Sequence, residues 1–182
     1  MRSVMLYKDG LVKIKDNPHD FVSLTQNKEL WEEVVNSSDR NAVLIAGAAF
    51  DTLLERLLKR NLIQDSAVSK KIAESSIFAS KINLCFSLGL ISEDENHDLN
   101  LLRDIRNAFA HNIFGCEFSN DQVKNAVSNL ILPRKARATP ENATPKGYFN
   151  IGMVVLDNFL SERVSEINTI IKRSNMRFAS EA

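Results

Sequence analysis

The sequence predicts an all-α helical bundle of about six or seven helices, preceded by an N-terminal segment that is either a short hairpin or a tail. The chain of 182 residues contains only 6 glycines and 4 prolines, and no proline lies between Pro18 and Pro133. Apolar residues make up 44% of the chain and charged residues 25%, an ordinary globular balance. These observations exclude a disordered chain, a collagen-like repeat and a turn-rich β-sandwich.

The N-terminal third is expected to contain the hairpin and the central helix. Asp9-Gly10 stands between two short apolar runs, which is typical of a two-residue hairpin turn within residues 1–18. Residues 20–36 predict one or two short helices. A long helix follows from an N-cap at Ser38 or Asp39 to about Leu62. We expect this helix to lie centrally because its apolar side chains surround much of its circumference, and its small residues 46–49 would let another helix approach closely.

The next helices are predicted from their caps and from their apolar spacing. Asp65 or Ser66 caps a short helix over residues 67–73, and a helix over residues 77–88 ends at Gly89. Ser92 and Glu95 form a capping box that opens a helix to about His111, and Ser119 and Gln122 form a second box before residues 121–130. For the helix over 77–88, the predicted buried face is Phe78, Ile82, Cys85 and Phe86.

A single domain is expected over residues 19–176, followed by a tail at 177–182. Residues 133–147 hold three of the four prolines and are predicted to be a loop. The last helix is expected over about residues 148–175, where Met153, Leu156, Leu160, Val164, Ile167 and Ile171 recur at helical spacing.

Charge and cysteine content narrow the function classes. The chain has 23 basic and 23 acidic residues, so a broad face for gripping nucleic acid is disfavoured, although a local basic patch is not. Cys85 and Cys116 form no C-x-x-C pair, and we expect a cytoplasmic chain without a disulfide framework. The longest apolar run, residues 42–50, is too short to cross a bilayer. The three histidines lie far apart in sequence, so no metal site and no cofactor is predicted.

One stretch of the helix that ends near His111 concentrates polar side chains. Asn107 and His111 are four residues apart on one face, and Asp104 lies on that face seven residues before His111. Arg106 is five residues before His111, about 140° away around an ideal helix. The stripe therefore does not assemble a complete site within one chain unless the long Arg106 side chain wraps back or reaches a neighbouring subunit.

The residue types in this stripe suit metal-free cleavage of RNA. His111 can move the proton of a ribose 2′-hydroxyl at neutral pH, Arg106 can neutralise the charge that builds on the phosphate, and Asn107 can orient either group. One histidine supplies only a base or an acid, so a homodimer with both copies in one cleft would complete the pair. Basic residues that would steer the substrate beside the site are Arg103, Arg134, Lys135 and Arg137.

The segment Arg106-Asn107-Ala-Phe-Ala-His111 resembles the R-[polar]-x3-H signature of the HEPN superfamily of helical-bundle proteins. The resemblance implies a dimeric, metal-independent endoribonuclease of a toxin–antitoxin or defence system, with Arg106 and His111 catalytic, Asn107 assisting, and an antitoxin or another protein as partner. Separately, residues 42–121 are similar to the mannitol operon repressor family, through FDTLLERLLKRNL, KINLCFSLGLISEDENHDLNLLRDIRNAFAH and the following F-S-N-D.

Two other readings of the sequence remain open. The second similarity implies a non-enzymatic transcriptional regulator or a protein-interaction bundle, although no DNA-reading motif is apparent in the chain. In the other, Arg106, Asn107 and His111 are ordinary features of a helix end, where a histidine favours the helix dipole. The cations of residues 133–147 would then be no more than a solvated linker.

Overall fold

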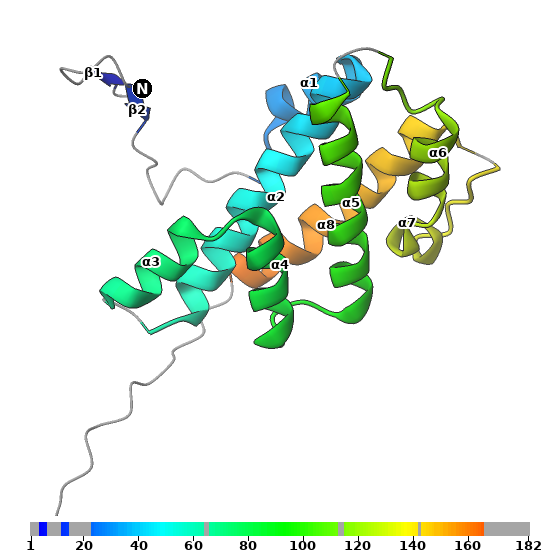
Figure 1. Cartoon of the computed structure of the whole chain (residues 1–182). Coiled ribbons are helices and arrows are strands. Elements are labelled where there is room, and N and C mark those ends of the chain that lie inside the picture. The colour runs from blue at the N-terminus through cyan, green and yellow to red at the C-terminus, as the bar shows by residue number, and fades with distance from the viewer. Residues whose placement is uncertain are drawn as a thin grey trace, which may run out of the picture.

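The computed structural model confirms the all-α class (Figure 1). The structure describes residues 4–6, 12–14, 23–63, 66–112, 115–141 and 143–165, and these contain eight helices. Among these residues, no helix is long and apolar enough to cross a membrane. The eighth helix exceeds the expected six or seven because one short helix, over residues 131–135, runs into the stretch predicted to be a loop.

The helices and strands have the following bounds: β1 Val4–Leu6, β2 Val12–Ile14, α1 Lys28–Asn36, α2 Asp39–Asn61, α3 Ala67–Ser75, α4 Phe78–Ser87, α5 Glu93–His111, α6 Asp121–Ser128, α7 Ile131–Lys135 and α8 Pro145–Ser165. The two strands pair antiparallel, with Val4 opposite Ile14, as expected for the N-terminal hairpin. Its predicted turn at Asp9-Gly10 lies outside the described residues, as do the predicted helical residues 166–175 and the tail at 177–182.

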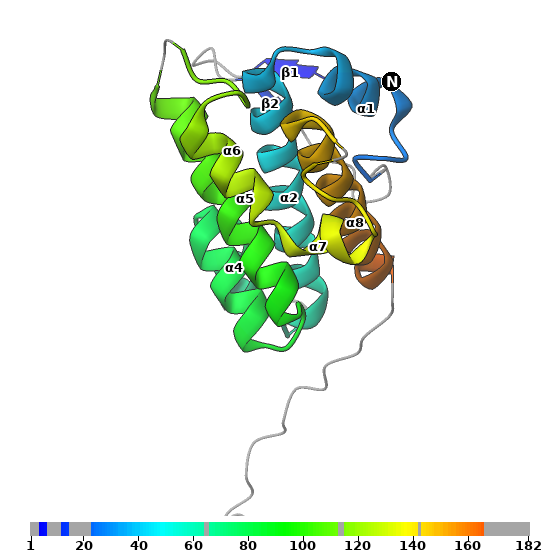
Figure 2. The ribbon, with the colours of Figure 1, turned by 90° about the vertical axis from the view of Figure 1, so that its right-hand side faces the viewer.

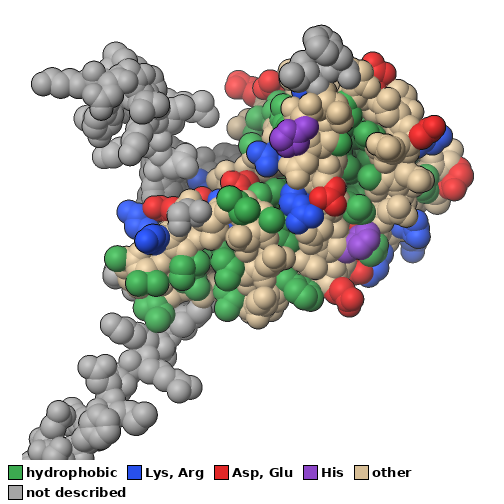
Figure 3. Space-filling model, viewed as in Figure 1, with side chains coloured by type: hydrophobic (Ala, Val, Ile, Leu, Met, Phe, Trp, Pro, Cys, Tyr) green, Lys and Arg blue, Asp and Glu red, His purple; other side chains and the backbone are tan. Residues whose placement is uncertain are grey.

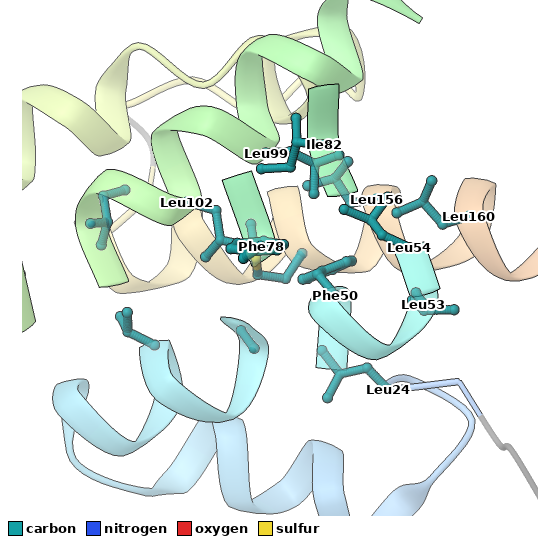
Figure 4. Packing of buried hydrophobic residues seen from close by; sticks show 14 of the residues in the cluster. Leu24, Phe50, Leu53, Leu54, Phe78, Ile82, Leu99, Leu102, Leu156 and Leu160 are labelled. Atoms are coloured by element: carbon teal, nitrogen blue, oxygen red, sulfur yellow. The ribbon is translucent and has the colours of Figure 1, made fainter. Parts of the chain in front are cut away.

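The central helix, α2, packs against α1, α3, α4, α5 and α8. Figure 2 shows α2, α4, α5 and α8 running side by side, with α1 lying across one end. Apolar residues at helical spacing form a stripe along α2 that is buried throughout: Val43, Ala46, Phe50, Leu53, Leu54, Leu57 and Leu58. Figure 4 shows Phe50 and Leu54 of α2 in the cluster with Leu99 and Leu102 from α5 and Leu156 and Leu160 from α8. α2 occupies the centre because a helix that packs against five others must be apolar around most of its circumference.

Local capping signals decide several helix ends as predicted. The Ser38 side chain accepts a hydrogen bond from the Asn41 amide at the start of α2. Ser92 and Glu95 form the reciprocal capping box of α5. At the end of α4, Gly89 has φ +69°, its N–H donates to the Phe86 carbonyl, and the Leu90 N–H donates to Cys85. This pair of bonds is a Schellman motif, which favours glycine at the positive-φ position.

Two predictions at α4 and α6 are wrong. The second capping box does not form, because α6 begins after Asn120 and the Ser119 hydroxyl donates to Glu117 instead. Phe86 was expected on the buried face of α4, yet its side chain is 44% exposed. Phe86 directly follows the buried Cys85. Because neighbouring residues of a helix point about 100° apart, the Phe86 side chain lies at the edge of the buried face.

The predicted loop over residues 133–147 is shorter than expected at both ends. α7 extends to Lys135, and α8 begins at Pro145. The carboxylate of Asp98, buried on α5, accepts the amides of Ile131 at 2.9 Å and Leu132 at 2.8 Å and so satisfies the first donors of α7. Pro133 fits the first turn of α7, where its missing N–H has no intrahelical partner to lose. This contact joins residues 33 and 34 positions apart, so no local pattern signals it.

A second buried carboxylate fixes the segment before α1. Asp157 of α8 accepts hydrogen bonds from the backbone amides of Leu24 and Thr25, each at 2.9 Å, and from the Thr25 hydroxyl at 2.6 Å. The chain therefore forms a turn at residues 24–26, and α1 starts only after its cap at Asn27. Helix was expected from about residue 20, and residues 20–22 lie outside the described ranges.

Candidate functional site

α5 carries the three residues of the R-N-x3-H motif at its C-terminal end. Asn107 and His111 are exposed, Arg106 is partly buried, and the opposite side of the helix buries Leu102, Ile105 and Phe109. His111 is the last residue of α5 and therefore lies beside carbonyls that have no helical partner. Both histidines within the described ranges are visible as purple side chains on the face shown in Figure 3. Asn107 and His111 thus share an accessible polar face, as predicted.

The Arg106 side chain of α5 packs against the α2 backbone at Gly47. A Cβ atom added to Gly47 would stand 2.6 Å from Cδ of Arg106 and 3.2 Å from its Nε. Because glycine lacks that atom, the aliphatic part of Arg106 can rest directly on the α2 backbone. This contact accounts for part of the close approach predicted from the small residues 46–49 of α2.

The Arg106 guanidinium has no hydrogen-bond or ion-pair partner among the residues that the structure describes. A guanidinium carries five N–H donors and is charged at any physiological pH. Arg106 therefore combines a packed aliphatic stem with a charged head that is available to an anion. A structural arginine, in contrast, normally forms an ion pair with a carboxylate.

A second arginine reaches the same end of α5 and was missed by the sequence reading. Arg40, in the first turn of α2, donates a hydrogen bond from Nη2 to the carbonyl oxygen of Asn112, the C-cap of α5. Arg40 lies beside Asn112 and Gly47 lies beside Arg106, so α2 and α5 run antiparallel. The contact spans 72 residues, and only the packing of the two helices reveals it.

A hollow of about 620 Å³ lies between the C-terminal half of α5 and α6, next to the motif. Asp104, Ala108 and Asn112 line it from α5, and Cys116 lies on its wall. Burial raises the pKa of the Cys116 thiol, the Arg40 charge lowers it, and Asp39 raises it, with a net increase. The thiol is therefore protonated at neutral pH and is a poor nucleophile.

The cations expected to steer substrate do not gather at His111 within one chain. Lys135 forms an ion pair with Asp94 in the first turn of α5. Asp94 precedes His111 by 17 residues, which is about 25 Å along a helix. Arg134 donates to the Ser128 carbonyl at 3.3 Å, and Arg137 is exposed with φ 64°.

Arg103 is nearer the motif but is already paired. Its Nη2 lies 2.8 Å from Asp104, and its Nη1 donates to Asn100, also at 2.8 Å. The charge of Arg103 is therefore already balanced by Asp104. Of the predicted cations, Arg106 alone joins a free charge to the exposed Asn107 and His111.

The described residues contain no other strong candidate for acid–base or metal chemistry. His97 lies 3.0 Å from the buried Asp98 through Nδ1, but it precedes His111 by 14 residues, about 21 Å along α5. No group of three or more histidine, cysteine or acidic side chains in the described ranges could hold a metal ion. Burial raises the pKa of Cys85 to about 12, despite the opposing charge of Lys81, so this thiol is inert.

Comparison of the chain with protein families, with curated proteins and with solved structures finds no match. The residues of the α5 motif and their surroundings therefore indicate the function.

Proposed function

We propose that the protein is a metal-independent endoribonuclease of the HEPN type that acts as a homodimer in the cytoplasm. The observation that carries the proposal is Arg106, whose stem lies over Gly47 and whose guanidinium has no hydrogen-bond or ion-pair partner among the described residues, at a helix end that also exposes Asn107 and His111. An arginine that can stabilise a phosphate and a histidine that can move a proton are the two kinds of group that phosphodiester cleavage without a metal requires.

The chemistry follows from the roles of the three side chains. His111 accepts the proton of a ribose 2′-hydroxyl, and the resulting oxygen attacks the adjacent phosphorus. The bond from phosphorus to the 5′-oxygen breaks, and that oxygen takes a proton from an acid. The products are a 2′,3′-cyclic phosphate and a 5′-hydroxyl. Arg106 stabilises the charge on the non-bridging phosphate oxygens, and Asn107 orients the histidine or the phosphate.

A second copy of the chain supplies the missing acid in this proposal. An apolar patch of α3 and the start of α4, consisting of Val68, Ile72 and Ile77, is exposed in the single chain, with Val68 at 67% and Ile77 at 71%. Figure 3 shows hydrophobic side chains gathered over α3 and the adjoining part of α4, on the same view that displays both histidines. Contact between two such patches would bury this apolar area and favours a dimer over a monomer.

The test is cleavage of a 5′-labelled RNA by wild type, Arg106→Ala, His111→Ala and His97→Ala. His97→Ala is the matched control, because it removes an exposed histidine from the same helix but outside the motif. We expect wild type and His97→Ala to leave 2′,3′-cyclic ends, and both motif variants to lose at least about 100-fold in rate. A substrate with a single 2′-deoxyribose at the cleaved position should resist all four proteins.

The nuclease proposal fails if wild type leaves RNA intact while sedimentation shows a dimer. It also fails if His111→Ala cuts as fast as wild type. The exposed patch on α3 and α4 then favours the alternative, a non-enzymatic regulator that acts through protein contacts, as the similarity to the mannitol operon repressor family implies.

A further inference from the structure

Two arginines lie along one seam of the bundle, the line where α2 and α5 meet. Arg40 and Gly47 are seven residues apart in α2 and therefore share one face, about 10.5 Å apart along the axis. Arg106 of α5 rests on Gly47, and Arg40 reaches the Asn112 carbonyl at the end of α5. The two side chains thus border the same end of the seam, where His111 immediately precedes Asn112.

Neither arginine is neutralised by a carboxylate among the residues that the structure describes. Nearby Asp39 accepts the Phe118 amide at 3.0 Å and lies 3.6 Å from Lys146. Asp51, one turn beyond Gly47, pairs with Lys81 through Oδ2 at 3.1 Å, although its buried Oδ1 has no partner. In a chain with zero net charge, two arginines without an acidic partner create a local positive potential at this seam.

The donors that remain on these arginines suit phosphate. Arg40 has one N–H engaged by the Asn112 carbonyl, and the rest of its fork, like all of the Arg106 fork, has no other partner among the described residues. The planar guanidinium matches the oxygens of a phosphate group in a way that a lysine does not. Two such groups separated along a helix fit an extended polyanion better than a single small anion.

We propose that Arg40 and Arg106 form a two-arginine site that binds the phosphodiester backbone of single-stranded RNA along the α2–α5 seam. This inference rests on the proposed nuclease function, since it assigns Arg106 to the reacting phosphate and Arg40 to a neighbouring one. Arg40 is then a substrate-binding residue that extends the contact beyond the cleaved bond. Gly47 is a positioning residue, because it leaves the space in which Arg106 lies.

The experiment measures binding rather than cleavage. A fluorescent oligonucleotide with 2′-O-methyl riboses carries the backbone charge but has no attacking hydroxyl, and its affinity is read by anisotropy at several salt concentrations. The proteins are wild type, Arg40→Gln, Arg106→Gln and Lys28→Gln. Lys28, an exposed residue of α1, is the matched control for the loss of one positive charge.

Each arginine variant should bind about tenfold more weakly or worse, as expected for the loss of a charged hydrogen bond. The slope of log affinity against log salt should fall by about 0.7 for each lost phosphate contact. Lys28→Gln should bind as wild type does. Pyrophosphate should compete only at far higher concentration than the oligonucleotide; equal competition would overturn the backbone assignment in favour of a small-anion site.

A structural role for Arg40 is distinguished by Arg40→Lys, which retains the charge and one donor to Asn112. If Arg40→Gln and Arg40→Lys melt alike and only the glutamine variant loses the salt slope, the charge acts on the ligand. An unchanged slope in folded Arg40→Gln overturns the inference, and so does a wild type that fails to bind. Binding that depends on both arginines without any RNA cleavage would refute the nuclease but leave the anion site in place.

Discussion

Gly47→Ala tests whether the Arg106 side chain occupies the space over α2. The new Cβ would stand 2.6 Å from Cδ of Arg106, well inside van der Waals contact, so the arginine must move. Alanine is favoured over glycine inside a helix by about 0.8–1.0 kcal/mol. Moving Arg106 out of its rotamer costs about 0.5–1.5 kcal/mol. The net change in unfolding free energy should therefore lie between a gain of about 0.5 and a loss of about 0.7 kcal/mol.

A double-mutant cycle isolates this contact from the helix propensity. In an Arg106→Ala background nothing opposes the new methyl group, so Gly47→Ala should give the full gain of about 0.8–1.0 kcal/mol, or about 2–4 °C in Tm. The coupling energy between the two positions should be about 0.5–1.5 kcal/mol. Urea unfolding of the four proteins, followed by circular dichroism, measures every corner of the cycle.

The reasoning is refuted if Gly47→Ala stabilises both backgrounds equally, within about 0.3 kcal/mol. Arg106 would then lie elsewhere in solution, and the assignment of Gly47 as a positioning residue would fall with it. The same variant also separates position from charge. Gly47→Ala retains every cation, so loss of RNA cleavage in a stable Gly47→Ala protein would show that the location of Arg106 matters.

Burial alone would raise the pKa of Glu55, but hydrogen bonds and charges from Lys59 and Lys81 lower it overall. Ionised Glu55 therefore stabilises the folded state above about pH 4.5, and this contribution is lost as pH falls through the lowered pKa. Wild type should therefore lose more Tm than Glu55→Gln on acidification from pH 6 to pH 3. Iodoacetamide at pH 8 should alkylate Cys116 slowly and leave Cys85 untouched, because burial raises the pKa of Cys85 to about 12; mass spectrometry reads both. Asp157→Asn should cost about 2–3 kcal/mol, because a neutral amide replaces a buried carboxylate that accepts three hydrogen bonds; thermal melts measure the loss.

Each of these predictions has a control and a contrary result. Glu162→Gln, at an exposed acid of α8, should leave the acid limb of the Tm profile unchanged, and a Glu55→Gln profile that parallels wild type would contradict the pH argument. Urea should expose Cys85 to alkylation, and its labelling in the native state would mean that α4 opens readily. Asn158→Asp alters the exposed neighbour of Asp157, and it should leave Tm within about 1 °C, as surface substitutions usually do.

The helical elements and most of the core could be predicted because the signals for them are local. Apolar residues recur at helical spacing along α2 and along the inner face of α5, and the structure buries both sets. Caps such as Ser38 and the Ser92–Glu95 box act within one turn, so four residues are enough to define them. The composition likewise sufficed for the all-α class, since few glycines and prolines leave long uninterrupted helices.

In the candidate site, too, some features follow from local sequence and others from tertiary packing. The sequence by itself determined that Asn107 and His111 share one exposed face near a helix end, because helix geometry places residues four apart on one face. Only the tertiary structure decided that Gly47 accommodates Arg106, that Arg40 joins them, and that Lys135 pairs with Asp94 instead. These contacts depend on which helix faces meet and in which direction the helices run. The pairing of faces minimises the exposed apolar area of the whole chain, and no short stretch of sequence contains that information.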